Sequence, residues 1–104
     1  MRFYKIFLTV FVLSISTMSL AVSGVKVNEI YYCGEDFAIR TSNNNWYVVQ
    51  KTKVGAEKLN HFLSLAMFMM ASGKEISNVF PGEPLDNWCG NKGFKPITIL
   101  GVRN

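Results

Sequence analysis

The sequence predicts a small α+β domain, mainly β, in which five short strands form a barrel and one helix lies between the third and the fourth strand. Three observations predict this fold. Apolar residues recur at helical spacing over several turns in one stretch, residues 55–73. The segments on either side are short runs rich in β-branched and aromatic residues. Turn-forming residues separate these runs, and no repeat, linker or low-complexity stretch divides the chain into two domains.

The chain begins with a segment that we expect to be removed on export. Two basic side chains lie in the first five residues, an apolar stretch follows, and residues 19–21 (SLA) offer a small-x-small cleavage pattern. Residues 1–21 are therefore predicted to be a secretory signal peptide, with cleavage after Ala21 or after Ser23. Residues 22–104 are predicted to be a single domain of a secreted or periplasmic protein. The alternative is an uncleaved membrane anchor.

The two cysteines, Cys33 and Cys89, are predicted to form one disulfide. A domain of this size has a marginal hydrophobic core, and small exported domains often add a covalent link. An even number of cysteines in an oxidising compartment pairs most simply within the chain. Closing a loop of that span stabilises the fold by about 4 kcal/mol in the chain-entropy model. Together with one histidine, His61, the cysteines fall short of a tetrahedral metal site, so no metal or other cofactor is expected.

The charge of the chain is modest and evenly spread. The sequence has 11 Lys and Arg against 7 Asp and Glu, a formal charge of +4. Removal of Arg2 and Lys5 with the leader lowers this charge to +2, and the two signs are interleaved along the mature chain. Nucleic-acid binding depends on clustered basic residues, so we expect no nucleic-acid partner.

Three strands are expected before the helix. Residues 25–32 (VKVNEIYY) alternate apolar with polar but change phase across Asn28-Glu29, a shift that a β-bulge explains. Residues 37–40 (FAIR) restart a strand after a turn and complete a hairpin. Residues 46–50 (WYVVQ) follow the polar turn TSNNN. The three strands are therefore expected to form an antiparallel meander.

The helix at residues 55–73 has two apolar faces. The stripe expected to face the sheet consists of Ala56, Leu59, Phe62, Leu63, Ala66 and Met70. The opposite side carries Leu65, Phe68 and Met69 in its later turns. A loop wrapped over these side chains, or ordinary scattered exposure, is one explanation. The other is an oligomer interface, in which this side packs against copies of itself.

The sequence also indicates where the helix begins and ends. Thr52 is a candidate N-cap, and Gly73 is the residue type preferred just after a helix end. The uninterrupted apolar run at residues 65–71 is far shorter than the roughly 20 residues needed to span a bilayer. No membrane span is therefore expected after cleavage of the leader.

Two further strands are expected after the helix. Residues 74–80 (KEISNVF) read as the fourth strand, which Pro81-Gly82 ends. Residues 83–93 are expected to be a loop, because proline and glycine interrupt them. Residues 94–102 read as the fifth strand, with Ile97 and Ile99 on one face. The order of three strands, one helix and two strands is that of the oligonucleotide- and oligosaccharide-binding (OB) barrel, and a generic antiparallel sheet crossed by one helix is the alternative.

The sequence shows no arrangement typical of an enzyme. His61 lies on the polar side of the helix, without a nucleophile at a motif-like spacing. The carboxylates are spread over turns and strands, and nothing pairs two of them as an acid and a base. We therefore expect a protein that is not an enzyme.

Segments spread over nearly the whole mature chain match a known pattern. They are SGVKVNEIYY, NWYVV, LNHFLSLAMFMMASGKEI and NVFPG, and the most specific is the helix end ASGK followed directly by a strand. In these segments the chain resembles the family of the subtilase cytotoxin B subunit and related small exported bacterial proteins. The resemblance implies the OB barrel, a ring of five subunits with helices around a central pore, and binding of host-cell glycans. It also implies a separate enzymatic subunit as a partner.

The resemblance and the sequence each indicate ligand-binding residues. The family's glycan-contacting serine lies in a segment that matches Ser23-Gly24-Val25, and its contacting tyrosine falls at Phe80. Trp88 is the further candidate, because it lies between Asn87 and Cys89 in a loop that the disulfide would fix. We expect Trp88 to be partly exposed and to lose little entropy on binding. The aromatic residues near strand ends or turns are Tyr31, Tyr32, Trp46, Phe80 and Trp88.

Two classes of function follow from these observations. One is an exported, non-catalytic and oligomeric module that binds a host glycan or glycoprotein receptor, as a toxin B subunit does. The other is a periplasmic or surface protein that uses the same barrel to contact an unknown protein partner.

Overall fold

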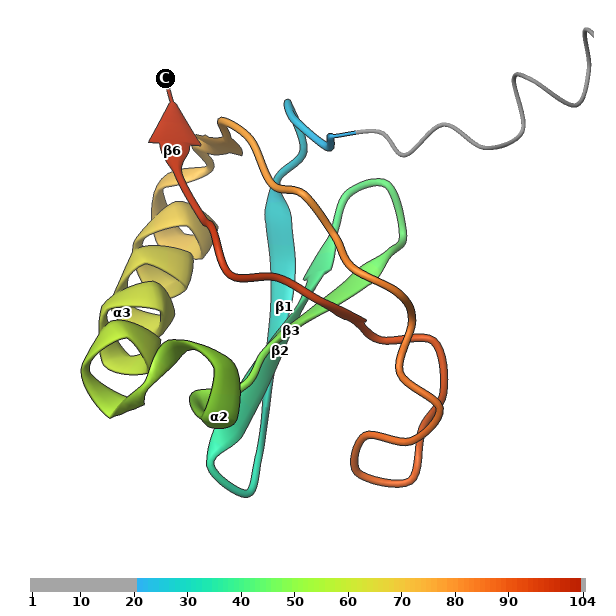
Figure 1. Ribbon diagram of the computed structural model, residues 1–104. Helices are drawn as coiled ribbons and strands as arrows, with labels where there is room; N and C mark the ends of the chain where they lie inside the picture. Colours follow the sequence, from blue (N-terminus) through green and yellow to red (C-terminus); the bar gives the residue numbers. More distant parts are fainter. Residues whose placement is uncertain (1–20, 104) are drawn as a thin grey trace, which may run out of the picture.

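The computed structural model describes residues 21–103, and the predicted signal peptide at residues 1–21 lies outside them but for its last residue (Figure 1). The described chain is an α+β domain, as predicted, with one long helix. Three strands follow one another: β1 (Val27–Cys33), β2 (Asp36–Thr41) and β3 (Trp46–Val49). They pair antiparallel in chain order, which confirms the predicted meander.

Strand β1 contains the predicted bulge. Val27 pairs with Thr41, but Glu29 pairs with Arg40, so Asn28 is an extra residue in β1. A bulge moves every later side chain of its strand to the other face of the sheet. As a result, Glu29 lies on the face that points away from the main core.

Two helices follow β3. α2 (Lys51–Val54) is one short turn, and α3 (Ala56–Ser72) is the long helix. Gly55, with φ 88°, separates them, and no side chain caps α3. The expectation that Thr52 caps the long helix is wrong, because Thr52 lies inside α2. Gly73 ends α3 as predicted: it takes the left-handed conformation, φ 72°, and its N–H donates to the carbonyl four residues earlier at 2.9 Å.

The strands after α3 are shorter than predicted. β4 (Glu75–Ile76) covers only the start of the strand expected at residues 74–80. The strand expected at residues 94–102 is broken into two pieces, β5 (Lys95–Pro96) and β6 (Val102–Arg103). Each prediction therefore placed a strand correctly but overestimated how far its regular pairing continues.

The break between β5 and β6 shows in the burial of the side chains. Ile97 and Leu100, three residues apart, are buried, whereas Ile99 is 52% exposed. The expected alternation of Ile97 and Ile99 on one face is therefore wrong. Pro96 has no N–H to donate to a ladder, and after Ile97 donates to the Val48 carbonyl at 2.9 Å the chain leaves the sheet.

The strands form two sheets. β5 pairs parallel with β3, which gives a four-stranded sheet in the order β1-β2-β3-β5, and β4 pairs with β6 in a two-stranded sheet. Isolated antiparallel bridges, Val22 with Val79 and Lys26 with Glu75, connect the chain before β1 to the segment that begins with β4. Among the described residues, the sheets are not closed into a continuous barrel.

The main core lies between α3 and the inner face of the larger sheet (Figure 1). Each strand of the meander contributes alternate side chains to this face, as a half-buried sheet requires. The buried residues that α3 contributes are Leu59, Phe62, Ala66 and Met69. The buried residues of β2 and β3 in this core are Phe37, Ile39, Tyr47 and Val49.

Three predictions about the faces of α3 are corrected. Met69, expected on the oligomer side, is fully buried, and Met70, expected in the core stripe, is 43% exposed. The next buried residue after Ala66 is Met69, three positions later, and not Met70, four positions later. Because a helical turn has 3.6 residues, either spacing is possible, and the sequence spacing alone does not show which side chain is buried. Ala56, at the start of the expected stripe, is exposed as well.

Replacing Met69 by alanine should lower the free energy of unfolding by about 3 kcal/mol, because it leaves a cavity in the core. Met67, on the same helix and 54% exposed, is the matched control. Met67→Ala should change stability by less than about 0.5 kcal/mol. Urea denaturation of both variants measures the difference, and equal losses would contradict the assignment of the buried face.

Candidate functional site

The loop at residues 82–94 packs on the outer face of the sheet. Figure 1 shows this loop and α3 on opposite sides of the meander. Trp88 and Phe94 from the loop form a second buried cluster with Ala38 and Val48 of the sheet. Both faces of the meander are therefore covered, the inner one by a helix and part of the outer one by a loop.

A covalent bond and hydrogen bonds hold this loop in place. The predicted disulfide between Cys33 and Cys89 is present and joins the end of β1 to the loop. The indole Nε1 of Trp88 donates to Asp36 Oδ2 at 3.2 Å. Within the loop, the backbone N–H groups of Trp88 and Asn91 each donate to the other residue's carbonyl, at 2.8 and 2.9 Å. These bonds fix the position of the loop, although it contains none of the strands β1 to β6.

The expectation that Trp88 is partly exposed is wrong. Its side chain is 6% exposed, with its ring centroid 4.9 Å from that of Phe94. The neighbours of Trp88 in the sequence, a cysteine and two asparagines, are compatible with an exposed ring and with a buried one. The sequence alone therefore does not show that the ring is buried beneath its own loop. Trp88 holds the loop to the sheet and offers little of its ring to a ligand.

The loop leaves a hollow uncovered beside it on the same face. The hollow has a volume of about 390 Å³, which is within the range of small-molecule sites. Its lining combines aromatic rings with one carboxylate, one amide and one ammonium group. The lining residues are Glu29, Tyr31, Trp46, Asn91, Lys92 and Phe94.

The aromatic part of the hollow is a connected set of rings. The ring centroids of Trp46 and Phe94 are 5.1 Å apart, and Tyr31 meets Trp46 edge-on at 6.4 Å. Tyr31 also meets the buried ring of Trp88 at 6.0 Å. Tyr31 is 45% exposed and Trp46 is half-buried, so both rings are packed from behind and still reach solvent.

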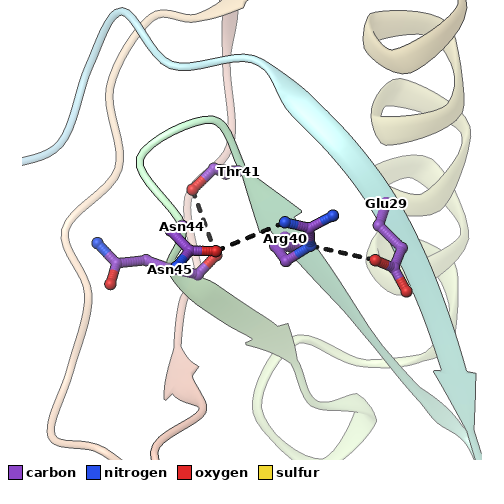
Figure 2. Close-up of polar contacts among 5 residues, drawn as sticks. All are labelled: Glu29, Arg40, Thr41, Asn44 and Asn45. Atoms are coloured by element: carbon purple, nitrogen blue, oxygen red, sulfur yellow. Dashed lines mark hydrogen bonds and ion pairs between the residues drawn. The ribbon is translucent and has the colours of Figure 1, made fainter.

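A row of polar side chains borders these rings. Glu29 on β1 is paired in register with Arg40 on β2, and Arg40 is paired in register with the aromatic residue Trp46 on β3. Figure 2 shows Arg40 between Glu29 and Asn44: its Nε donates to Glu29 Oε1 at 3.1 Å, and its Nη1 donates to Asn44 Oδ1 at 3.5 Å. These groups are exposed, so the ion pair adds little stability. It places the Glu29 carboxylate beside the guanidinium of Arg40.

The turn between β2 and β3 brings Asn44 to Arg40. Asn44 is left-handed, φ 65°, a conformation that asparagine tolerates better than most residues. Its N–H donates to the Thr41 carbonyl at 2.8 Å, and the Thr41 N–H donates to the Asn45 carbonyl at 3.0 Å. The Thr41 hydroxyl also donates to Asn45, at 3.3 Å (Figure 2). These hydrogen bonds close the turn, and a left-handed residue just before the second strand is typical of short hairpin loops.

The two ligand residues that the resemblance indicated flank one β-bridge, and neither lines the hollow. Val22 and Val79 form this antiparallel bridge, so Ser23 and Phe80, each next in sequence after a bridge residue, lie on opposite sides of it. Both are exposed, Phe80 by 57%, because successive side chains of paired strands point in opposite directions and Val79 points into the core.

The three residues expected at an oligomer interface have different environments. Met69 is in the core, and Leu65 is half-buried against it. Phe68 is 50% exposed, and Met67 and Met70 on the same helix are exposed as well. Of the expected set, only Phe68 offers a large apolar surface to a partner.

Most of the hollow was missed at the level of sequence. The sequence marks Tyr31 and Trp46 only as aromatic residues near strand ends. It does not predict Glu29, Lys92 or Phe94 as site residues. One signal was present: the phase change across Asn28-Glu29 predicts a bulge, and bulges commonly redirect a side chain at a functional site. No comparable signal places Lys92 or Phe94, because the loop's position depends on tertiary packing.

Comparisons with family models, with curated proteins and with solved structures find no match to this chain. Within residues 21–103, no helix has the length and apolar character needed to cross a bilayer. In the same part of the chain, no three His, Cys, Asp or Glu side chains gather in a group that could hold a metal ion.

Replacing Trp88 by alanine should lower the free energy of unfolding by about 3 kcal/mol, because it removes the largest ring of the second cluster. Trp88→Phe is the matched control. It keeps an aromatic ring and removes the hydrogen bond to Asp36, so its loss should be near 1 kcal/mol. Thermal unfolding of both variants measures the difference. A Trp88→Ala protein as stable as the unmodified one would show that the loop does not depend on this ring.

Proposed function

We propose that this chain is an exported, non-catalytic module that binds a glycan or a glycoprotein receptor through the aromatic hollow. The observation that carries the proposal is the combination of ring faces at Tyr31 and Trp46 with polar groups at Glu29, Asn91 and Lys92. Sugars present apolar C–H faces together with many hydroxyl groups, so a binding site for them needs both kinds of surface. Sites of this composition fix a small ligand with a few convergent polar groups.

The surroundings of the carboxylates support a binding role over a catalytic one. Glu29 pairs with Arg40, and Glu75 pairs with Arg103 at 3.5 Å. Glu35 accepts a hydrogen bond from Lys51 Nζ at 2.8 Å, and this contact raises the pKa of Lys51 above its ordinary value. Each of these carboxylates is thus paired with a cation at the surface. A catalytic acid and base would instead have to reach the same substrate from two sides.

We propose further that the architecture is an opened form of the five-stranded OB barrel. Taking β5 and β6 as the two ends of one interrupted strand, the pairing runs from β1 through β2 and β3 to β5, and from β6 to β4. The bridge between Lys26 and Glu75 leads from β4 back to the start of β1. The parallel pair of β3 with β5 and this return bridge support the barrel order that the sequence predicts.

The resemblance to toxin B subunits adds an assembly to the proposal. In this reading the chain is secreted or periplasmic and forms a homo-oligomer, five subunits by resemblance, that carries a separate enzymatic subunit. The exposed side chains of Met67, Phe68 and Met70 on α3 support a contact between copies. The alternative is a periplasmic or surface protein in which the same surfaces contact a protein partner.

Screening the purified mature protein on a glycan array tests the function. Trp46→Ala should weaken binding to the recognised glycan at least tenfold, equivalent to about 1.4 kcal/mol, because it removes a ring of the hollow. Phe80→Ala is the matched control, since Phe80 is an exposed aromatic residue outside the hollow's lining. Thermal unfolding establishes that both variants are folded.

Two results would contradict the proposal. Loss of binding in Phe80→Ala together with unchanged binding in Trp46→Ala would move the ligand site to the Ser23 and Phe80 end. If the unmodified protein binds no glycan on the array but binds a deglycosylated protein partner, the protein-contact alternative is favoured.

A further inference from the structure

We infer that the free edge of β1 pairs with the same edge of a second copy of this chain. The contact is twofold symmetric and joins the sheets of the two copies into one. The inference rests on the self-association included in the proposed function and names the strand that makes one of its contacts. Its support comes from the exposure of β1, the direction of its backbone groups and the bounds of its regular pairing.

β1 lies at the edge of the four-stranded sheet, and its later residues are exposed on both faces. Tyr31 is 45% and Tyr32 58% exposed, although successive side chains of a strand point to opposite faces. Their partners in register on β2, Ala38 and Phe37, are fully buried. The exposure therefore comes from the edge position of β1. A strand added beside β1 covers both rings, whereas a partner on either face of the sheet covers only one.

The hairpin geometry indicates which backbone groups of β1 face the free edge. Cys33 pairs in register with Asp36 across the two-residue turn Gly34-Glu35, and such a flanking pair exchanges both of its backbone hydrogen bonds. Bonded and non-bonded pairs alternate along an antiparallel ladder. Ile30 and Tyr32 therefore direct their N–H and C=O groups away from β2.

These outward groups are open to a partner. Within residues 21–103, no backbone hydrogen bond joins Ile30 or Tyr32 to a segment beyond β1's own hairpin. The bridge between Lys26 and Glu75 touches only the chain before β1. A row of unpaired donors and acceptors at a sheet edge is a template for another strand.

The open stretch is complementary to itself about its middle residue. The bulge at Asn28 ends the regular pairing on one side and the turn ends it on the other, which leaves the stretch Glu29–Cys33. Two such stretches overlap fully, in the antiparallel sense, when Tyr31 lies opposite Tyr31 of the second copy. Ile30 then lies opposite Tyr32 of that copy in a bonded pair, so the outward groups of both residues are satisfied.

The side-chain pairs of this register are favourable on both faces of the sheet. On the outer face the two Tyr31 rings meet across the twofold axis, and aromatic cross-strand pairs stabilise antiparallel sheets. On the inner face each Tyr32 lies opposite an Ile30 that is already half-buried. Glu29 lies opposite Cys33, so no like charges meet. A second copy therefore matches this edge in length, direction and charge.

The contact also determines what the assembly presents. Glu29 and Tyr31 line the hollow, so pairing about Tyr31 places the hollows of two copies side by side on one continuous outer face. A twofold contact is closed, so it doubles whatever assembly the other surfaces form. The result is two copies if the edge acts alone, and ten copies if it joins two rings of five.

Hydrogen exchange of the mature protein at two concentrations tests the inference. The contact is short, so we expect a dissociation constant of roughly 10–100 μM. The amides of Ile30 and Tyr32 should exchange at least about threefold more slowly at about 500 μM than at about 5 μM, because only the second copy protects them. The amide of Tyr31, which is bonded to β2, is the internal control and should not change.

A pair of charge variants tests the register. Tyr31→Lys and Tyr31→Glu each place like charges at the twofold axis, so each alone should halve the mass of the assembly in sedimentation equilibrium. An equal mixture of the two should restore the full mass, because opposite charges then meet across the axis. This recovery also shows that both variants fold. Phe80→Lys, which changes another exposed aromatic residue outside β1, is the control and should keep the full mass.

Three outcomes would overturn the inference: exchange of the Ile30 and Tyr32 amides that does not depend on concentration, a mass of one copy or of five, or charge variants that keep the mass of the unmodified protein. Its failure is distinct from failure of the proposed function. Glycan binding on the array by a single copy, or by a ring of five with free β1 edges, would refute only the twofold pairing. A twofold assembly that binds no glycan would refute only the glycan-binding function.

Discussion

The packing of one indole ring beneath its own loop organises the outer half of this domain. Trp88 lies on Ala38 and Val48, and its Nε1 is bonded to Asp36. The disulfide at Cys33 joins the same loop to the end of β1, where Cys33 pairs in register with Asp36. A loop without regular strands gains its fixed position from such long-range contacts, because its own backbone pairing is limited. The meander is consequently covered on its inner face and on part of its outer face, and consecutive residues of β2 and β3 are buried.

The hollow follows from this packing and from the bulge in β1. The loop covers one part of the outer face and brings Phe94 and Lys92 to the edge of the rest. The extra residue at Asn28 places Glu29 on that face, beside Arg40 and in line with Trp46. Ring faces, a carboxylate and an ammonium group thus meet from two strands and a loop. A binding site built this way is more rigid than one on an unsupported loop.

The sequence predicted those features that depend on local pattern. The meander, the bulge, the helix and its glycine stop are confirmed, because alternation, helical spacing and turn residues determine them over short distances. The sequence also predicted the disulfide, since two cysteines allow one pairing. It misjudged Met69 and Trp88, whose burial depends on what packs against them across the fold. For the same reason the hollow could not be predicted: its walls come from segments that are distant in sequence, and no local pattern records their contact.

Hydrogen exchange of the loop amides, with and without the disulfide, tests the central claim most directly. The amides of Trp88 and Asn91, which bond to each other's carbonyls, should be protected in the oxidised protein. In the Cys33→Ser, Cys89→Ser double variant these amides should exchange at least tenfold faster, while those of β2 remain protected. Loop amides that exchange at the rate of an unstructured peptide in the oxidised protein would contradict the account, because the loop would then not be fixed to the sheet.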